Sequence, residues 1–79
     1  MPRRLYIPRE VHVKAGDDGA PARVEDVPVE AIREEWMVED RWWSEEPLRR
    51  RYFELVLADG RDVVVFRELV SGRWFSQRA

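Results

Sequence analysis

The chain has 79 residues, and its 14 basic and 16 acidic side chains nearly cancel to a formal net charge of −2. It contains no cysteine, which excludes disulfides, thiolate chemistry and cysteine-based metal sites. The length allows one domain over residues 1–79, no apolar run approaches the roughly 18 residues that cross a bilayer, and the start lacks the hydrophobic region of a signal peptide, so we expect a cytoplasmic protein.

The first predicted element is a short hairpin. Residues 10–15 alternate polar and apolar side chains, as a half-buried strand does, and Gly16-Asp17-Asp18-Gly19 forms a turn toward a second strand at residues 22–24. The alternation places the valines inward and His12 outward, between Glu10 and Lys14. The only histidine is therefore predicted to be a solvated surface residue.

Residues 28–38 fit two structures. Val29, Ile32 and Trp36 have helical spacing behind Pro28, and the intervening residues are good helix formers. In a strand, by contrast, Ile32, Glu34, Trp36 and Val38 would share one face. Propensity alone favours the helix.

The clearest local signal is a hairpin at residues 50–68. Two runs of β-branched and aromatic residues flank Asp59-Gly60, a dipeptide typical of a two-residue turn in which both residues tolerate positive φ. Such a loop fixes the register and predicts these opposite pairs: Leu57 and Asp62, Leu55 and Val64, Phe53 and Phe66, Arg51 and Glu68. The other face would carry Tyr52, Val56, Val63 and Val65, and a strand pair apolar on both faces indicates a closed or sandwiched sheet.

The remaining segments extend the same pattern. Ser71-Gly72 predicts a second turn, followed by a third strand at residues 73–78, and residues 39–49 predict a structured loop around Trp42-Trp43. The fold class expected from these elements is all-β: a small antiparallel meander of five to six strands that closes into an SH3-like or OB-like barrel.

The sequence offers no catalytic constellation or cofactor motif. His12 has no nucleophile nearby, the three serines are not in nucleophile-elbow settings, and the four glycines form no phosphate-binding loop. Neighbouring carboxylates such as Glu34-Glu35 would point apart on a strand. One histidine without cysteine gives no metal-ligand cluster, and the 16–19 segment is too short for a calcium loop. We expect no enzyme activity, no cofactor and no metal.

Arginine supplies 13 of the 14 basic residues, and the chain has neither Asn nor Thr. Dense charge with few thermolabile residues indicates a thermophilic source, although a GC-rich genome gives the same arginine bias.

The charge is unevenly distributed. Residues 1–9 carry a net +3, residues 10–46 a net −8 and residues 47–79 a net +3, which gives a dipolar surface and not a uniform polyanion-binding one. Three readings of the four tryptophans and the 49–51 arginine run remain open. They can bind single-stranded nucleic acid by stacking and phosphate contacts, they can form a protein-binding surface, or the tryptophans can fill the core while arginines pair with the acidic 39–46 segment. We favour the core reading over nucleic-acid binding because the chain is net negative.

One resemblance adds to this reading. The ordered motifs Trp42-Trp43, Arg49-Arg50-Arg51-Tyr52, Asp59-Gly60-Arg61 and Gly72-Arg73-Trp74-Phe75 resemble a small bacterial family of unknown function. They also resemble the C-terminal segment of ImuB-type proteins, the inactive Y-family DNA polymerase homologues of damage-induced mutagenesis. The likeness covers residues 19–79. It implies a strand at residues 28–38 and an accessory domain in DNA damage tolerance, with no catalytic residues.

Together these observations predict a non-catalytic protein-interaction module, whose partner would belong to a DNA polymerase or repair assembly. The alternative is a domain that binds single-stranded nucleic acid through Trp and Tyr stacking and arginines. The same candidate surface serves both functions and consists of Trp42, Trp43, Arg49, Arg50, Arg51, Tyr52, Arg73 and Trp74.

Overall fold

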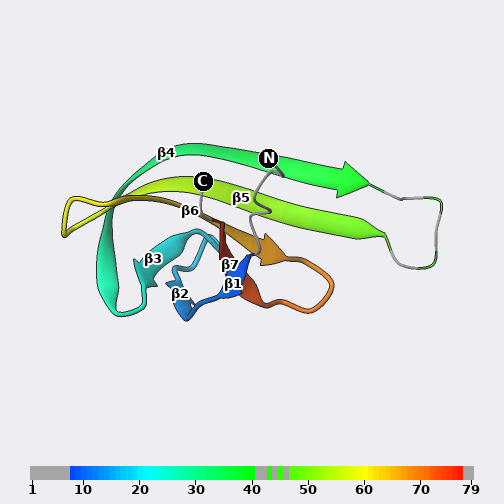
Figure 1. Ribbon diagram of the computed structural model, residues 1–79, viewed down its shortest axis with the longest axis horizontal. Helices are drawn as coiled ribbons and strands as arrows, with labels where there is room; N and C mark the ends of the chain where they lie inside the picture. Colours follow the sequence, from blue (N-terminus) through cyan, green and yellow to red (C-terminus); the bar gives the residue numbers. More distant parts are fainter. Residues whose placement is uncertain (1–7, 41–42, 44, 46, 78–79) are drawn as a thin grey trace, which may run out of the picture.

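The protein is an all-β domain in a computed structural model that describes residues 8–40, 43, 45 and 47–77 (Figure 1). Its seven strands are β1 (Arg9–Glu10), β2 (Val13–Ala15), β3 (Pro21–Val24), β4 (Val27–Asp40), β5 (Leu48–Leu57), β6 (Asp62–Glu68) and β7 (Trp74–Gln77). The all-β prediction is confirmed, and so is the strand, in place of a helix, at residues 28–38. The predicted count of five to six strands is wrong, because the strand expected at residues 10–15 is two strands separated by Val11 and His12.

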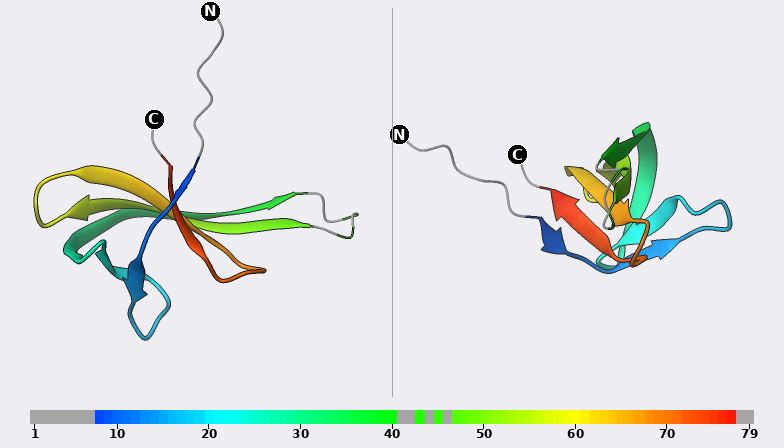
Figure 2. Two further views of the ribbon diagram at one scale, coloured as in Figure 1. Left: turned by 60° about the horizontal axis from the view of Figure 1, so that its bottom comes forward. Right: turned by 90° about the vertical axis from the view of Figure 1, so that its right-hand side faces the viewer.

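One antiparallel sheet with the order β1-β7-β6-β5-β4-β3-β2 curls into a half-barrel (Figures 1 and 2). Its two outermost strands, β1 and β2, are consecutive in the chain and are joined through Val11 and His12. The Val11 N–H donates to the Trp74 carbonyl at 3.1 Å, and the His12 carbonyl accepts from the Glu25 N–H at 2.8 Å. This junction therefore ties the two ends of the curled sheet together.

The core lies on one face of the sheet, which we call the inner face. Phe53, Leu55 and Leu57 of β5 and Val65 of β6 are fully buried, and Trp74 packs on Phe53 with ring centroids 5.7 Å apart. Each such side chain contributes roughly 1.5–3 kcal/mol on burial. The first hairpin closes the core with Val11, Ala20 and Val24. His12 is exposed, as predicted.

The Asp59-Gly60 hairpin is present, but its loop has three residues, 58–60. The Gly60 N–H donates to the Leu57 carbonyl and the Leu57 N–H to the Arg61 carbonyl, both at 2.9 Å. Only Gly60 has positive φ, at 92°, so this is a turn followed by a left-handed glycine and not a two-residue primed turn.

The extra loop residue makes the predicted register wrong by one position. The observed pairs are Arg50 and Glu68, Tyr52 and Phe66, Phe53 and Val65, Leu55 and Val63. Phe66 therefore lies on the outer face with Tyr52, while Val63 and Val65 join Phe53 on the inner face. The Arg–Glu pair expected at the end of the hairpin is formed by Arg50 and not by Arg51.

Strand β4 changes face along its length. Its register with β5 shifts between Val29 and Ala31 and again between Ile32 and Glu34, which marks two bulges. Ile32 is opposite Leu55 of the inner face, whereas Trp36 is opposite Tyr52 of the outer face. The expectation that Ile32 and Trp36 share a face is therefore wrong, since the second bulge inserts a residue between them.

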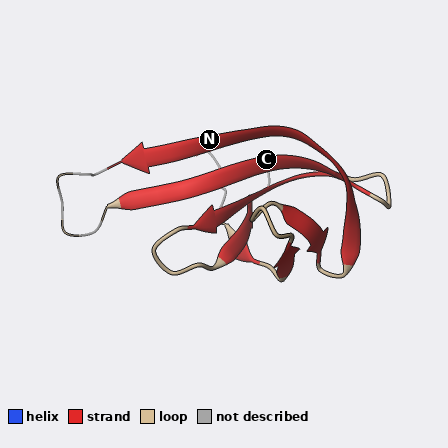
Figure 3. Cartoon of the chain, turned by 180° about the vertical axis from the view of Figure 1, so that it is seen from behind, coloured by secondary structure: helices blue, strands red, loops and turns tan. Residues whose placement is uncertain are grey.

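Past the end of β6, which pairs with residues 50–56 of β5, strands β4 and β5 continue as a two-stranded ribbon, visible in Figures 1 and 3. We call this ribbon and the stretch that leads to it, residues 34–40 and 48–52, the arm. The register between its strands runs without a break from Glu34 to Asp40. No helix that could cross a membrane occurs in the part of the chain that the structure describes.

Candidate binding site on the β4–β5 arm

Exposed apolar side chains concentrate on the arm and its approaches. Five large hydrophobic residues are exposed among the described residues, and four of them lie on β4 or in the loop that follows it: Ile32, Trp36, Met37 and Trp43. The fifth, Val70, follows β6. Trp36 and Met37 are adjacent on β4 and therefore point to opposite faces, and they are 38% and 51% exposed, so both faces of the arm meet solvent.

A row of four aromatic rings crosses the outer face from β4 to β7. Trp36 stacks on Tyr52 with centroids 5.3 Å apart and an interplanar angle of 8°. Tyr52 contacts Phe66 at 4.9 Å, and Phe66 contacts Phe75 at 5.3 Å. Trp36 is 38% exposed and Phe66 only 1%, so the row begins with a solvent-exposed ring on the arm and includes a buried ring over the barrel. Cross-strand aromatic pairs of this kind attach the arm to the barrel.

Arginine side chains cover this aromatic row. The Arg50 guanidinium lies 4.5 Å from the Phe66 ring centre, pairs with Glu68 at 3.3 Å and donates to the Tyr52 hydroxyl at 3.3 Å. Burial alone would lower the pKa of Arg50, but its bonds to Tyr52 and Glu68 outweigh that effect and raise it. At the far end, Arg73 lies 5.6 Å from the Phe75 ring centre.

The Arg73 guanidinium also binds Glu10 through two hydrogen bonds of 3.0 and 2.6 Å. The hydrogen bond with Glu10 raises the pKa of Arg73, and the same bond lowers the pKa of Glu10. Arg50 and Arg73 are thus both paired with carboxylates, which reduces the charge they can offer to a phosphate.

The inner face of the arm holds two more ion pairs. Arg51 pairs with Glu35 and lies 4.9 Å from the Phe53 ring centre, and Arg49 pairs with Glu39 at 3.3 Å. The latter confirms the expected pairing between the arginine run and the acidic 39–46 segment. An open hollow beside the pair of Arg51 and Glu35 is lined by these two residues and by Trp36, Met37 and Leu69.

The structure divides the predicted surface among four places. Arg50, Tyr52 and Arg73 lie on the outer face, Arg49 and Arg51 lie on the inner face, and Trp43 is 67% exposed in the loop at the arm tip. Trp74 is only 8% exposed and belongs to the core, so the core interpretation of the tryptophans holds for this residue. Trp42 lies outside the described residues.

Sequence reasoning missed Trp36 and Met37 as surface residues. Adjacent side chains on a strand point to opposite faces, so this apolar pair cannot be buried on one face of a ribbon. A strand at residues 28–38 therefore already implies that at least one of these two side chains is exposed. The stacked partners of Trp36, by contrast, depend on the register, which the sequence did not predict correctly.

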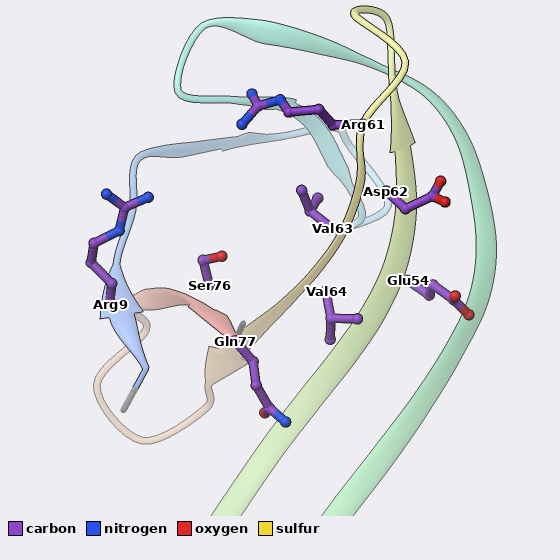
Figure 4. Close-up of a pocket in the computed structure, with 8 residues that line it drawn as sticks. All are labelled: Arg9, Glu54, Arg61, Asp62, Val63, Val64, Ser76 and Gln77. Atoms are coloured by element: carbon purple, nitrogen blue, oxygen red, sulfur yellow. The ribbon is translucent and has the colours of Figure 1, made fainter. Parts of the chain in front are cut away.

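A second hollow lies where β6 extends past the end of β7 (Figure 4). Its charged residues are Arg9, Arg61, Glu54 and Asp62, and Figure 4 shows the two carboxylates on one side of β6 and the two guanidinium groups on the other. They do not converge on a common point. Within the described residues, no three His, Asp or Glu side chains form a group that could hold a metal ion.

The chain matches no protein-family model, no curated protein and no solved structure.

Proposed function

We propose that this protein is a non-catalytic protein-interaction module, built on a small SH3-like or OB-like barrel, that binds its partner with the β4–β5 arm. One observation carries the proposal: the barrel closes its own core, while the exposed apolar side chains remain on and around the arm. Met37 is 51% exposed and Trp43 67%, whereas Phe53, Leu55 and Leu57 of the barrel are fully buried. Exposed apolar residues grouped in one region, with charged neighbours, are typical of a protein-binding surface.

The composition of the arm supports this use. Tryptophan, tyrosine and arginine are the residue types most enriched among interface hot spots, and the arm presents all three. Trp36 and Met37 point to opposite faces of the ribbon, so a partner can hold the arm from either side.

The biological setting rests on the resemblance to the C-terminal segment of ImuB-type proteins. It supports an accessory role in DNA damage tolerance, with a partner from a polymerase or repair assembly. The half-barrel and the exposed arm are compatible with a domain that contributes contacts and no chemistry.

Charge favours a protein partner over single-stranded nucleic acid. Residues 27–48 contain seven acidic and two basic side chains, a net of −5, and the arginines that follow on β5 are paired with Glu39, Glu68 and Glu35. Phosphate binding at this surface would require breaking those pairs beside further carboxylates.

Tryptophan fluorescence during an oligonucleotide titration separates the two functions. We expect no quenching at low salt. Quenching that weakens steeply as salt is raised would show a phosphate-driven complex and overturn the protein-partner proposal.

The arm itself is tested with a Met37→Ala, Trp43→Ala double variant in a quantitative pull-down from the organism that encodes the chain. The matched control is Val70→Ala, because Val70 is 71% exposed, more than either replaced residue, but lies outside β4 and β5. Circular dichroism establishes that both variants fold. We expect the double variant alone to lose its specific partner, and an unchanged partner list would contradict the proposed surface.

A further inference from the structure

The arm leaves one edge of β4 without a neighbouring strand. In the described part of the chain, β3 pairs with β4 only at Val27 and Pro28, so the outer edge from residue 29 to residue 40 has no partner. The two bulges interrupt its first part, and bulges protect a strand edge from pairing. Residues 34–40 have no such interruption, so they form a regular, open strand edge.

Hydrogen bonding identifies the groups exposed on that edge. Leu57 and Arg49 bond to the β6 side, to Arg61 and Leu69, and Ala58 bonds to Pro28 of β4. In an antiparallel sheet successive residues direct their N–H and C=O to alternate sides, so the even-numbered residues of β5 face β4. Their partners in the arm are the even-numbered residues of β4. The N–H and C=O groups of Glu35, Met37 and Glu39 therefore point outward from the sheet.

The side chains along this edge have a symmetric pattern. Glu34 and Glu35 precede the apolar Trp36, Met37 and Val38, and Glu39 and Asp40 follow them. Glu35 and Glu39 form ion pairs with arginines of β5, while Glu34 has no ion pair within the described residues. An incoming strand would thus meet an apolar centre between two acidic ends.

Resting on the proposed function, we infer that residues 34–40 bind an extended segment of the partner as an added β-strand, and that this segment has basic ends and an apolar centre. The outward groups of Glu35, Met37 and Glu39 supply the backbone ladder, and the side-chain pattern supplies the selectivity.

The same pattern disfavours a second copy of this chain as the occupant. Antiparallel self-pairing centred on Met37 would place Glu34 opposite Asp40 and Glu35 opposite Glu39. Like charges directly opposite each other destabilise a strand pair. A basic segment turns each of these contacts into an attraction.

Met37 offers a clean test because its N–H points away from β5. Met37→Pro removes that donor and places a ring on the open edge while leaving the ladder to β5 intact, as proline is tolerated on edge strands. Met37→Ala is the matched control, since it loses the same side chain but keeps the N–H.

The probe is a fluorescein-labelled peptide, Lys-Arg-Val-Ile-Val-Arg-Lys, titrated with the full chain by fluorescence anisotropy. A second probe carries glutamate at every basic position, and a third has N-methyl groups on alternate backbone nitrogens.

We expect the first peptide to bind wild type most tightly and Met37→Ala more weakly, through the lost apolar side chain. Met37→Pro should bind about tenfold more weakly than Met37→Ala, through the lost hydrogen bond and the ring clash. The glutamate and N-methyl probes should bind at least about tenfold more weakly than the first. Equal affinity of the proline and alanine variants, or no binding of the first peptide, would overturn strand addition.

A wild-type dimer in sedimentation analysis that Met37→Pro converts to a monomer would make a second copy the occupant. These results are separable from the pull-down, because loss of a partner in the Met37→Ala, Trp43→Ala variant alone would support the arm without strand addition.

Discussion

Strand β5 passes through both the barrel and the arm, and its surroundings change along the way. From Phe53 to Leu57 its inner side chains are fully buried. From Leu48 to Tyr52 every described side chain is at least partly exposed, and the three consecutive arginines each pair with a carboxylate. Pairing with β4 is unbroken from Glu54 to Leu48 and so crosses the boundary between the two regions.

The difference shows that one ribbon can be stabilised in two ways. The barrel gains from removing apolar surface from water, whereas the arm relies on its backbone ladder, on the aromatic row and on ion pairs that are individually worth about 0–1 kcal/mol each. The barrel therefore determines whether the domain folds, and the arm remains available for binding.

The largest expected effect tests the barrel. Phe53→Ala removes a fully buried ring that contacts Trp74, and should lower the free energy of unfolding by about 3–5 kcal/mol. That is a large part of the ~5–15 kcal/mol typical of a small domain. Urea unfolding followed by circular dichroism measures it. Met37→Ala, at a side chain of the arm that is 51% exposed, should cost less than about 1 kcal/mol. Similar losses in the two variants would remove the distinction between barrel and arm.

The sequence predicted the elements better than their relative positions. The Asp59-Gly60 signal located the hairpin correctly, because a glycine at positive φ is needed there in either turn. The loop length could not be read from the same dipeptide, and one extra residue moved Phe66 from the inner face to the outer face. The aromatic row was therefore not predictable without the structure.

The strand at residues 28–38 illustrates the opposite case. Local propensity favoured a helix, but pairing with β5 along nearly the whole segment determines a strand. The bulge beside Ile32 then reverses the face of that side chain, and nothing in the local sequence marks its position. For the candidate site, the arginines and tryptophans of the sequence indicated the arm. They could not show that Trp74 is buried, because its burial depends on how β7 packs against the core.

Gly60 controls the register on which this comparison rests. No atom lies within 4 Å of a Cβ added there, so Gly60→Ala would cost only the strain of φ +92°, about 1–2 kcal/mol. Thermal unfolding measures the loss. Gly16→Ala is the matched control, because its added Cβ meets only ordinary contacts and its φ is not in the left-handed region. Equal effects would show that conformational strain at the hairpin is not the cause.

A smaller effect tests how firmly the arm is attached to the barrel. A double-mutant cycle with Trp36→Ala and Tyr52→Ala should give a coupling of about 0.5–1.5 kcal/mol, as expected for stacked rings. Unfolding in urea provides the four free energies. The cycle of Tyr52→Ala with Val70→Ala should be additive, since no ring contact joins those residues. Zero coupling between Trp36 and Tyr52 would mean that the aromatic row contributes nothing to holding the arm.

The smallest effect concerns the exposed pair of Glu10 and Arg73, which links β1 to β7 in the barrel. The hydrogen bond from Arg73 lowers the pKa of Glu10 below its ordinary value of 4.5, with a weaker contribution from His12. A carboxyl pKa that is lower in the folded state stabilises the fold above pH 4.5, and the benefit is lost as the pH falls through the folded value. Glu10→Gln should therefore lower the urea midpoint at neutral pH, and the difference in midpoint from wild type should close at an acidic pH below the folded pKa of Glu10. Added salt should narrow the gap at neutral pH, because both side chains are exposed to solvent. A gap that stays the same at both pH values would show that residue 10 acts through packing and not through charge.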